Sequence, residues 1–146
     1  MYRHLLLATD GSELAQKAVA QGLALAEALQ ARVTAVTVTD PVPPMVSGDA
    51  SFVVPLQEYD RAATAHAARI LDAAAAAAGS AGVTCEVVHV KDQLAAQGIL
   101  DTAKAKGADL IVMASHGRRG ISKLLLGSQA AEVVSQSSVP VLVYRQ

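Results

Sequence analysis

A glycine-containing loop near the carboxyl end of the chain offers the groups that hold a phosphate. Gly117 and Gly120 have no Cβ, so the backbone there can turn tightly and approach a ligand closely. Backbone N–H groups in such a turn can point inward as an anion nest. Gly127 and Ser128 then open a predicted helix, whose first amides and partial positive charge also suit a phosphate. This pattern indicates a polyphosphate site.

Side chains around the same loop add positive charge. Arg118, Arg119 and Lys123 place three cations in a nearly neutral chain, and Ser128 adds a hydroxyl. Each feature also has an explanation without a ligand, because serine can cap a helix, arginines can be solvated charges and glycines can serve only a turn. Their coincidence after a strand and before a helix favours phosphate binding.

A second polar loop lies near the amino terminus, at Thr9, Asp10, Gly11 and Ser12, with Ser12 placed to cap a helix. Both loops follow apolar runs that are typical of buried strands. Ligands of open parallel sheets bind outside the carboxyl ends of the strands, where the strand order reverses. If the two strands are neighbours, both loops face one crevice.

The pattern along the whole chain alternates between strand-like and helix-like segments. Helices are predicted over 14–29, 57–78, 94–106 and 128–136, with Gly79 and Gly82 ending the second and Gly107 closing the third. Strands are predicted over 4–9, 32–39, 83–90, 109–114 and 139–145. This alternation predicts an α/β fold with a parallel sheet covered by helices on both faces.

The connection from Asp40 to Asp60 differs from the rest, because it contains four of the five prolines. Its length and turn residues predict an irregular segment, either functional or a tolerated surface insertion. We expect residues 1–146 to form one domain. Whether this segment acts as a lid is left open by the sequence.

Composition and missing motifs narrow the function. A net charge of −1 and 3% aromatic residues argue against nucleic-acid binding. No apolar run approaches the roughly 18 residues of a membrane span. The start of the chain lacks a signal-peptide pattern, and Cys85 is a single cysteine, so a cytoplasmic location is expected. The signatures of P-loop, dinucleotide-binding and α/β-hydrolase proteins are missing, and the histidines have no metal-ligand spacing. His116 is the only histidine in the predicted site.

The segment VMASHGRRGISKLLLGS, residues 112–128, resembles the nucleotide-binding signature of the universal stress protein family, G-x2-G-x9-G-[ST]. Gly117 is followed by nine residues and then by Gly127 and Ser128, as that signature requires. The opening HLLLATDGSE and the closing SSVPVLVYR also resemble the family. Ala114 stands where the first glycine of the signature is usual. Its extra methyl is tolerated if φ stays negative.

The resemblance implies a three-layer sandwich with a five-stranded parallel sheet of order 3-2-1-4-5, a Rossmann-like adenine nucleotide-binding fold. It also implies a site for ATP, or for AMP or ADP, with Mg²⁺ held through the phosphates near Asp10. Ala8 and Val38 would flank the adenine, with the backbone of Val38 recognising its edge. The full set of implied residues is Ala8, Thr9, Asp10, Val38, Met113, Ala114, Ser115, His116, Gly117, Arg118, Arg119, Gly120, Gly127, Ser128, Gln129 and Ala130.

The leading interpretation is therefore an ATP-binding stress-response protein that works as a nucleotide-responsive homodimer, paired through the strand Val139–Arg145. The alternatives are a dimeric interaction module that binds no nucleotide, a weak ATP hydrolase, and a small enzyme that uses ATP to activate a substrate. Asp10 and His116 are the only candidates for activating a water, so we expect slow hydrolysis at most. No partner in nucleic acid or membrane is expected. The triggering stress, the downstream protein and the preferred nucleotide are not encoded in these patterns.

Overall fold

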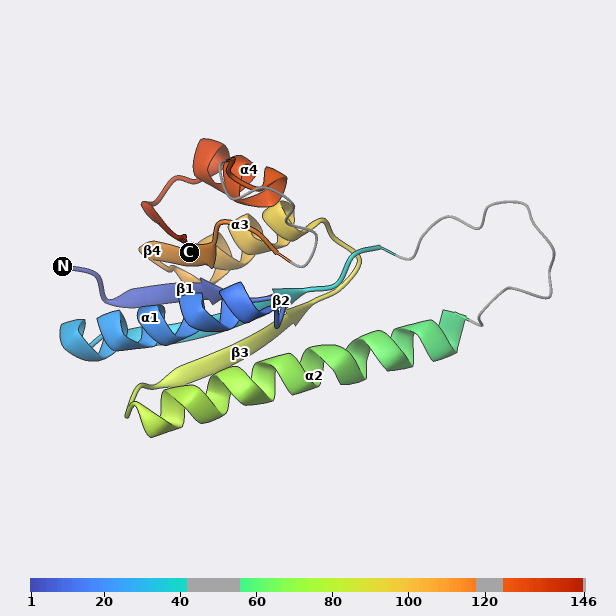
Figure 1. Ribbon diagram of the computed structural model, residues 1–146, viewed down its shortest axis with the longest axis horizontal. Coiled ribbons are helices and arrows are strands. Elements are labelled where there is room, and N and C mark those ends of the chain that lie inside the picture. The colour runs from blue at the N-terminus through green and yellow to red at the C-terminus, as the bar shows by residue number, and fades with distance from the viewer. Residues whose placement is uncertain (42–55, 118–124, 146) are drawn as a thin grey trace.

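The computed structural model describes residues 1–41, 56–117 and 125–145. Five strands and four helices alternate along this part of the chain (Figure 1). The elements are β1 (His4–Ala8), α1 (Glu13–Leu29), β2 (Arg32–Val38), α2 (Leu56–Ser80), β3 (Cys85–Val90), α3 (Ala95–Lys106), β4 (Leu110–Ala114), α4 (Ser128–Gln136) and β5 (Val141–Tyr144).

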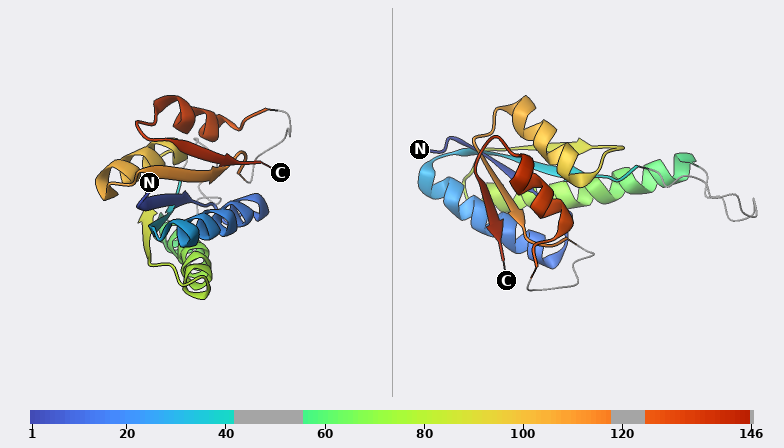
Figure 2. Two further views of the ribbon diagram at one scale, coloured as in Figure 1. Left: turned by 90° about the vertical axis from the view of Figure 1, so that its left-hand side faces the viewer. Right: turned by 90° about the horizontal axis from the view of Figure 1, so that it is seen from above.

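The strands form one parallel sheet of order β3-β2-β1-β4-β5, which confirms the expected topology. Helices α1 and α2 cover one face, and α3 and α4 cover the other (Figure 2). In β1, Leu5 and Leu7 pack toward α1 and α2, whereas Leu6 and Ala8 pack toward α3 and α4. Apart from His4, β1 is apolar, because both of its faces are buried.

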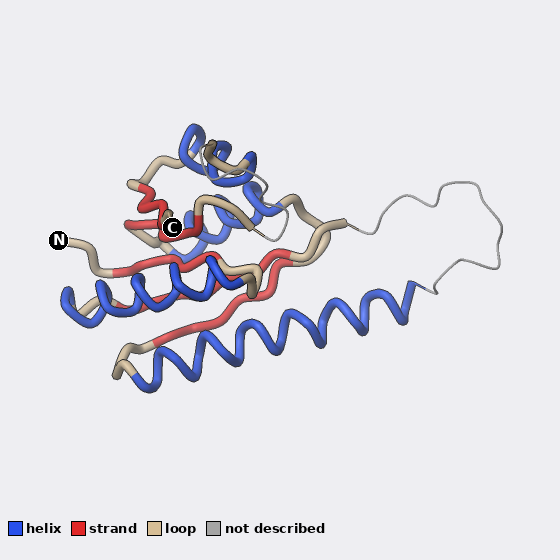
Figure 3. The backbone as a smooth tube through the Cα atoms, viewed as in Figure 1, coloured by secondary structure: helices blue, strands red, loops and turns tan. Residues whose placement is uncertain are grey.

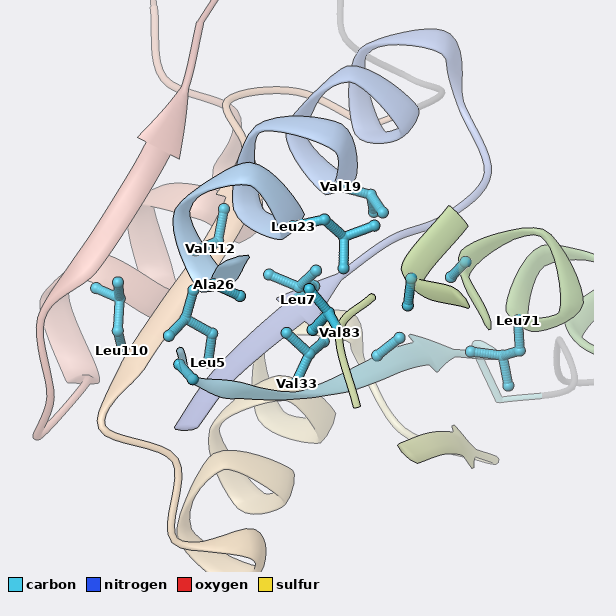
Figure 4. Close-up of a cluster of buried hydrophobic side chains, with 14 residues drawn as sticks. Leu5, Leu7, Val19, Leu23, Ala26, Val33, Leu71, Val83, Leu110 and Val112 are labelled. Atoms are coloured by element: carbon cyan, nitrogen blue, oxygen red, sulfur yellow. The ribbon is translucent and has the colours of Figure 1, made fainter. Parts of the chain in front are cut away.

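The core beneath α1 is built from short aliphatic side chains. Figure 4 shows Val19, Leu23 and Ala26 of α1 lying over Leu5, Leu7, Val33, Leu110 and Val112 of the strands. The polyalanine part of α2 adds Ala74 and Ala78 to the same cluster. These small residues pack against the sheet, and the amino-terminal half of α2 extends toward the carboxyl ends of the strands (Figure 3).

Several predicted boundaries were wrong by a few residues. Helix α2 continues through Gly79 and ends at Ser80, and the turn comes at Gly82, whose φ is 69°. Helix α2 begins at Leu56, one residue before its predicted start at Gln57, so the irregular connection does not extend to Asp60. Strand β5 begins at Val141 rather than Val139, since Pro140 has no amide to donate to the ladder. The rest of the predicted connection, 42–55, lies outside the described residues.

None of the helices within the described ranges is long and apolar enough to cross a lipid bilayer.

Candidate functional site

A cleft of about 1070 Å³ opens at the carboxyl ends of the strands. Most of the residues that the sequence assigned to a ligand line it: Ala8, Thr9, Asp10, Val38, Met113, Ala114, Ser115, His116, Gly117, Gly127, Ser128, Gln129 and Ala130. Arg118, Arg119 and Gly120, and also Lys123, lie outside the described residues. These described residues come from four separate segments of the chain, and the structure places them along one cleft.

The two polar loops meet because β1 and β4 are neighbours in the sheet. A Cβ built on Gly117 would lie 2.5 Å from Oδ2 of Asp10, so the loops touch and only glycine fits without a shift. The first loop is held by its own side chains. Oδ1 of Asp10 accepts a hydrogen bond of 2.9 Å from the amide of Ser12, and Oγ1 of Thr9 accepts one of 3.1 Å from Gly11. The crevice expected between the loops is confirmed.

Gly127 joins the second loop to α4. Its amide donates to the carbonyl of Ser115 at 2.9 Å, and a Cβ on Gly127 would lie 2.6 Å from that carbonyl oxygen. Two backbone segments approach too closely here for any side chain. Gly127 therefore has a structural role that needs no ligand, and the sequence did not indicate it.

The first turn of α4 presents unused amides to the cleft. The amide of Ala131 makes the first helical bond, to the carbonyl of Gly127. Among the described residues, none accepts a hydrogen bond from the amides of Ser128, Gln129 or Ala130. Gly127 is the N-cap, so the suggestion that Ser128 caps this helix was wrong. Unused first-turn amides together with the helix dipole favour an anion at this position.

Gln129 has a role that the sequence did not indicate. Its side-chain Oε1 accepts a hydrogen bond of 2.8 Å from the amide of Ala96, in the first turn of α3. Leu94, the N-cap of α3, cannot supply such a bond. The Gln129 side chain thus caps a neighbouring helix, and only its backbone amide remains for a ligand.

The residues that line the cleft divide between the two faces of the sheet, and we describe the cleft as two lobes on that basis. Strand residues alternate between faces, so Ala8, Val36, Val38 and Met113 point toward α3 and α4, where Ile99 and Ala130 join them. We call this the first lobe. Thr9 and Thr37 alternate with these residues along β1 and β2, so they lie on the other face, the one that α1 and α2 cover. The second lobe comprises Thr9, Ala15, Thr37, Thr39, Tyr59, Ala62, Ala63, His66, Ala67 and Ile70.

Sequence reasoning missed the wall of the second lobe that α2 provides. Tyr59, Ala63, His66 and Ile70 recur at helical spacing and line the cleft. The prediction that His116 is the only histidine of the site was therefore wrong, because His66 also lines it. The spacing of these residues was readable. Because alanines occur on every face of α2, however, the sequence did not indicate which face would line the cleft.

Ala114 occupies the position of the usual glycine without obstructing the first lobe. Its side chain packs with Ala15 and Ala18 of α1, on the opposite face of the sheet from α4. Ala114 is not among the described residues with a positive φ. The backbone conformation under which we expected the extra methyl to be tolerated is therefore present. The extra methyl group therefore packs against helix α1 and does not enter the first lobe.

Charge in the described lining is sparse. The only formally charged side chains there are those of Asp10 and Asp40. His116 lies half-buried, with Nδ1 3.1 Å from Oγ of the buried Ser115. Within the described ranges there is no cluster of three or more histidine, cysteine or acidic residues that could hold a metal. Backbone amides are thus the main anion-binding groups that the described part of the cleft supplies.

Comparisons with known proteins agree with this architecture. The model of the family described as "Universal stress protein family" matches residues 1–145. A universal stress protein of Thermus aquaticus, from the QAH/OAS sulfhydrylase 3′ region, is 36% identical over 145 residues, 99% of this chain and 100% of that relative.

Two solved structures share the fold over nearly the whole chain. The structure of protein MJ0577 of Methanocaldococcus jannaschii has a TM-score of 0.79 at 26% identity, covering 100% of this chain and 97% of that one. A universal stress protein in complex with cAMP has a TM-score of 0.73 at 29% identity, covering 99% and 97%. With the family match spanning residues 1–145 and this agreement in fold, the chain belongs to the universal stress protein family.

Proposed function

We propose that this protein binds an adenine nucleotide, ATP or its shorter forms AMP and ADP, in the first lobe of the cleft. The observation that carries the proposal is the first turn of α4, where the amides of Ser128, Gln129 and Ala130 face the cleft without partners among the described residues. Such a turn is suited to a phosphate chain. A related protein of known structure is in complex with cAMP, an adenine nucleotide.

The base has an apolar position beside these amides. Ala8 and Val38 end two adjacent strands, and Met113 and Ile99 lie on the same face. A planar purine between them would bury apolar surface, while the backbone of Val38 recognises its edge. Thr9, Ala114, Ser115, His116 and Gly117 surround the space between the base and α4, where ribose and phosphates would lie. Arg118, Arg119 and Gly120 belong to the same proposed site.

Magnesium fits only as a companion of the phosphates. Asp10 supplies one carboxylate at the cleft, and the described residues add no further cluster of metal ligands. Mg²⁺ is commonly held by one or two carboxylates together with substrate phosphates, so a single aspartate is consistent with that arrangement. The ion would neutralise the negative charge that Asp10 brings near the phosphates.

Rapid hydrolysis is not part of the proposal. The Nδ1 atom of His116 lies beside the Ser115 hydroxyl, and Oδ1 of Asp10 already accepts the Ser12 amide. An efficient hydrolase needs a base within hydrogen-bond reach of the attacking water. We therefore expect slow turnover at most.

We also propose that the protein is a homodimer joined through β5, within the predicted segment Val139–Arg145. Strand β5 is an edge of the sheet, and Leu142 on it is 39% exposed. An unprotected apolar edge strand invites pairing. Sedimentation equilibrium should find a dimer that Leu142→Lys converts to monomer, whereas Val87→Lys on the opposite edge strand β3 leaves the dimer intact. A monomeric wild-type chain would refute this part.

Two substitutions at one position test nucleotide binding. Ser128→Pro removes an amide hydrogen from the first turn of α4, yet proline is tolerated at the first helical residue. Gly127 already has the extended ψ of 152° that a residue before proline prefers. Ser128→Ala removes only the hydroxyl.

Calorimetric titration with ATP and Mg²⁺ should show saturable binding that Ser128→Pro weakens about tenfold or more, because one hydrogen bond to a charged phosphate is lost. Ser128→Ala should weaken it less. AMP and cyclic AMP in parallel titrations give the preferred number of phosphates. The proposal fails if the wild-type protein binds none of the three.

A further inference from the structure

We propose that the second lobe of the cleft is a separate binding position for an uncharged, planar heterocyclic ring with a hydrogen-bonding edge, as in a nucleoside. This position lies on the α1/α2 face of the sheet, away from the amides of α4. It goes beyond nucleotide binding in the first lobe and does not require it.

A hydroxyl that opens into the lobe, on a residue that is otherwise buried, offers a hydrogen bond to a ligand here. Thr37 is 4% exposed and lines the cleft, and no described residue forms a hydrogen bond with its side chain. Its neighbour on the same face, Thr39, is already paired, since its Oγ1 lies 2.6 Å from Nε2 of His89. The hydroxyl itself is not among the fully enclosed polar atoms without a partner, so it opens into the lobe, where it can bond a polar group of a ligand.

The α2 wall suits a flat ring. Ala62, Ala63 and Ala67 present only methyl groups to the lobe, which leaves a low surface along the helix. Tyr59 and His66 stand at either end of that surface, about 10 Å apart along the helix axis. Aromatic side chains favour planar partners by stacking or edge contacts. A planar ligand could thus lie over the alanines, with its edge toward Thr37.

The charges of the lobe argue for a neutral ligand. No lysine or arginine lines the cleft among the described residues, and Asp40 lies at its mouth. An anionic group would meet a carboxylate there without compensation, whereas ribose hydroxyls could donate to that carboxylate. The volume of the cleft, about 1070 Å³, slightly exceeds the usual range of about 300–1,000 Å³ for a site that holds one small molecule, which is consistent with a second ligand.

Such a ring could arrive free or tethered to a nucleotide. Titration of the full chain with adenosine, in the presence of saturating ATP and Mg²⁺, tests the free form. Diadenosine tetraphosphate, whose second nucleoside could reach the second lobe, tests the tethered form. Decanol serves as a probe for a purely apolar occupant.

We expect adenosine or the tethered nucleoside to bind, and Thr37→Val to weaken that binding about tenfold by removing one hydrogen bond at constant shape. His66→Ala should weaken it several-fold. Gln57→Ala, on the exposed side of α2, serves as the matched control and should have no effect. Affinity for ATP should be the same in all three variants.

The outcomes separate this proposal from nucleotide binding in the first lobe. If ATP fails to bind but adenosine binding depends on Thr37, the second lobe stands and the nucleotide proposal falls. If neither ring source binds, if Thr37→Val leaves ring binding unchanged, or if only decanol binds, the second-lobe proposal is wrong and the Thr37 hydroxyl is simply hydrated.

Discussion

The two ends of the same parallel sheet treat their polar groups in opposite ways. At the amino ends of the strands, Asp109 accepts the amides of Arg3 and His4 at 2.9 and 3.1 Å, and Nε2 of His4 lies 2.7 Å from Oγ1 of Thr34. Lys106 and Glu86 form an ion pair nearby. At the carboxyl ends, the first amides of α4 and the hydroxyl of Thr37 have no described partner. At the amino end the protein pairs most of these groups itself, with Nδ1 of His4 as an exception, whereas at the carboxyl end we propose that a ligand pairs them.

Removing the carboxylate that closes the amino end should have the largest effect. Asp109→Ala leaves two amides without their charged acceptor, and we expect the free energy of unfolding to fall by about 3 kcal/mol. Asp109→Asn keeps one acceptor oxygen and should lose less. Urea unfolding measures both. A loss below about 0.5 kcal/mol, the usual range for inert surface changes, would mean that this end is not held as described.

The same substitution at two positions of β2 compares the ends directly. Thr34→Val removes the partner of a buried imidazole and should cost about 2 kcal/mol, whereas Thr37→Val removes an unpartnered hydroxyl and should change stability by less than about 0.5 kcal/mol. The double variant His4→Leu/Thr34→Val removes both partners and should recover part of the loss. Thermal unfolding of the three proteins is sufficient, and equal losses at Thr34 and Thr37 would contradict the comparison.

A smaller effect should appear in the dependence of stability on pH. Burial, together with the charge of Arg32, lowers the pKa of His4 below its ordinary value, although Asp109 opposes this. Its Nδ1 is buried without a partner among the described residues. Between this lowered pKa and about 6.5, the unfolded chain binds the proton more readily than the folded chain. The contribution of neutral His4 to the free energy of unfolding is therefore fully present at neutral pH, and it decreases as the pH falls toward 5.

His89 contributes with the same sign, because burial and then Lys91 lower its pKa as well. Urea unfolding at a series of pH values should therefore show a slope that His4→Leu/Thr34→Val reduces without abolishing. An unchanged slope in the double variant would show that His4 is not the group responsible.

The fold could be predicted from the sequence because its signals are local. Apolar runs such as Leu5 to Leu7 identify buried strands, and Ser12 begins α1 as expected, with Oγ accepting the Ala15 amide. The convergence of the loops at Asp10 and Gly117 followed from parallel topology alone. These features depend on residue type and order, which the sequence contains.

Other features depend on which side chains meet across the fold, and local patterns do not encode that. Thr34 and Thr37 are the same residue type on the same strand, yet only Thr34 has a partner, a histidine from a different strand. Nothing in the sequence around Gln129 distinguishes it from other helical glutamines, and its role follows only from the position of α3 beside it. Ser128 was taken for a helix cap because serine favours that position, but glycine can occupy it too.

The bond from Gln129 to Ala96 couples the beginnings of α3 and α4 mechanically. Any displacement of the first turn of α4 either lengthens this 2.8 Å contact or carries the start of α3 along with it. Leu94 and Ala95 would then shift at the far wall of the same cleft. Through this side chain and the direct packing of α3 against α4, we expect a ligand bound at one helix to influence the other, and any such coupling would be reciprocal.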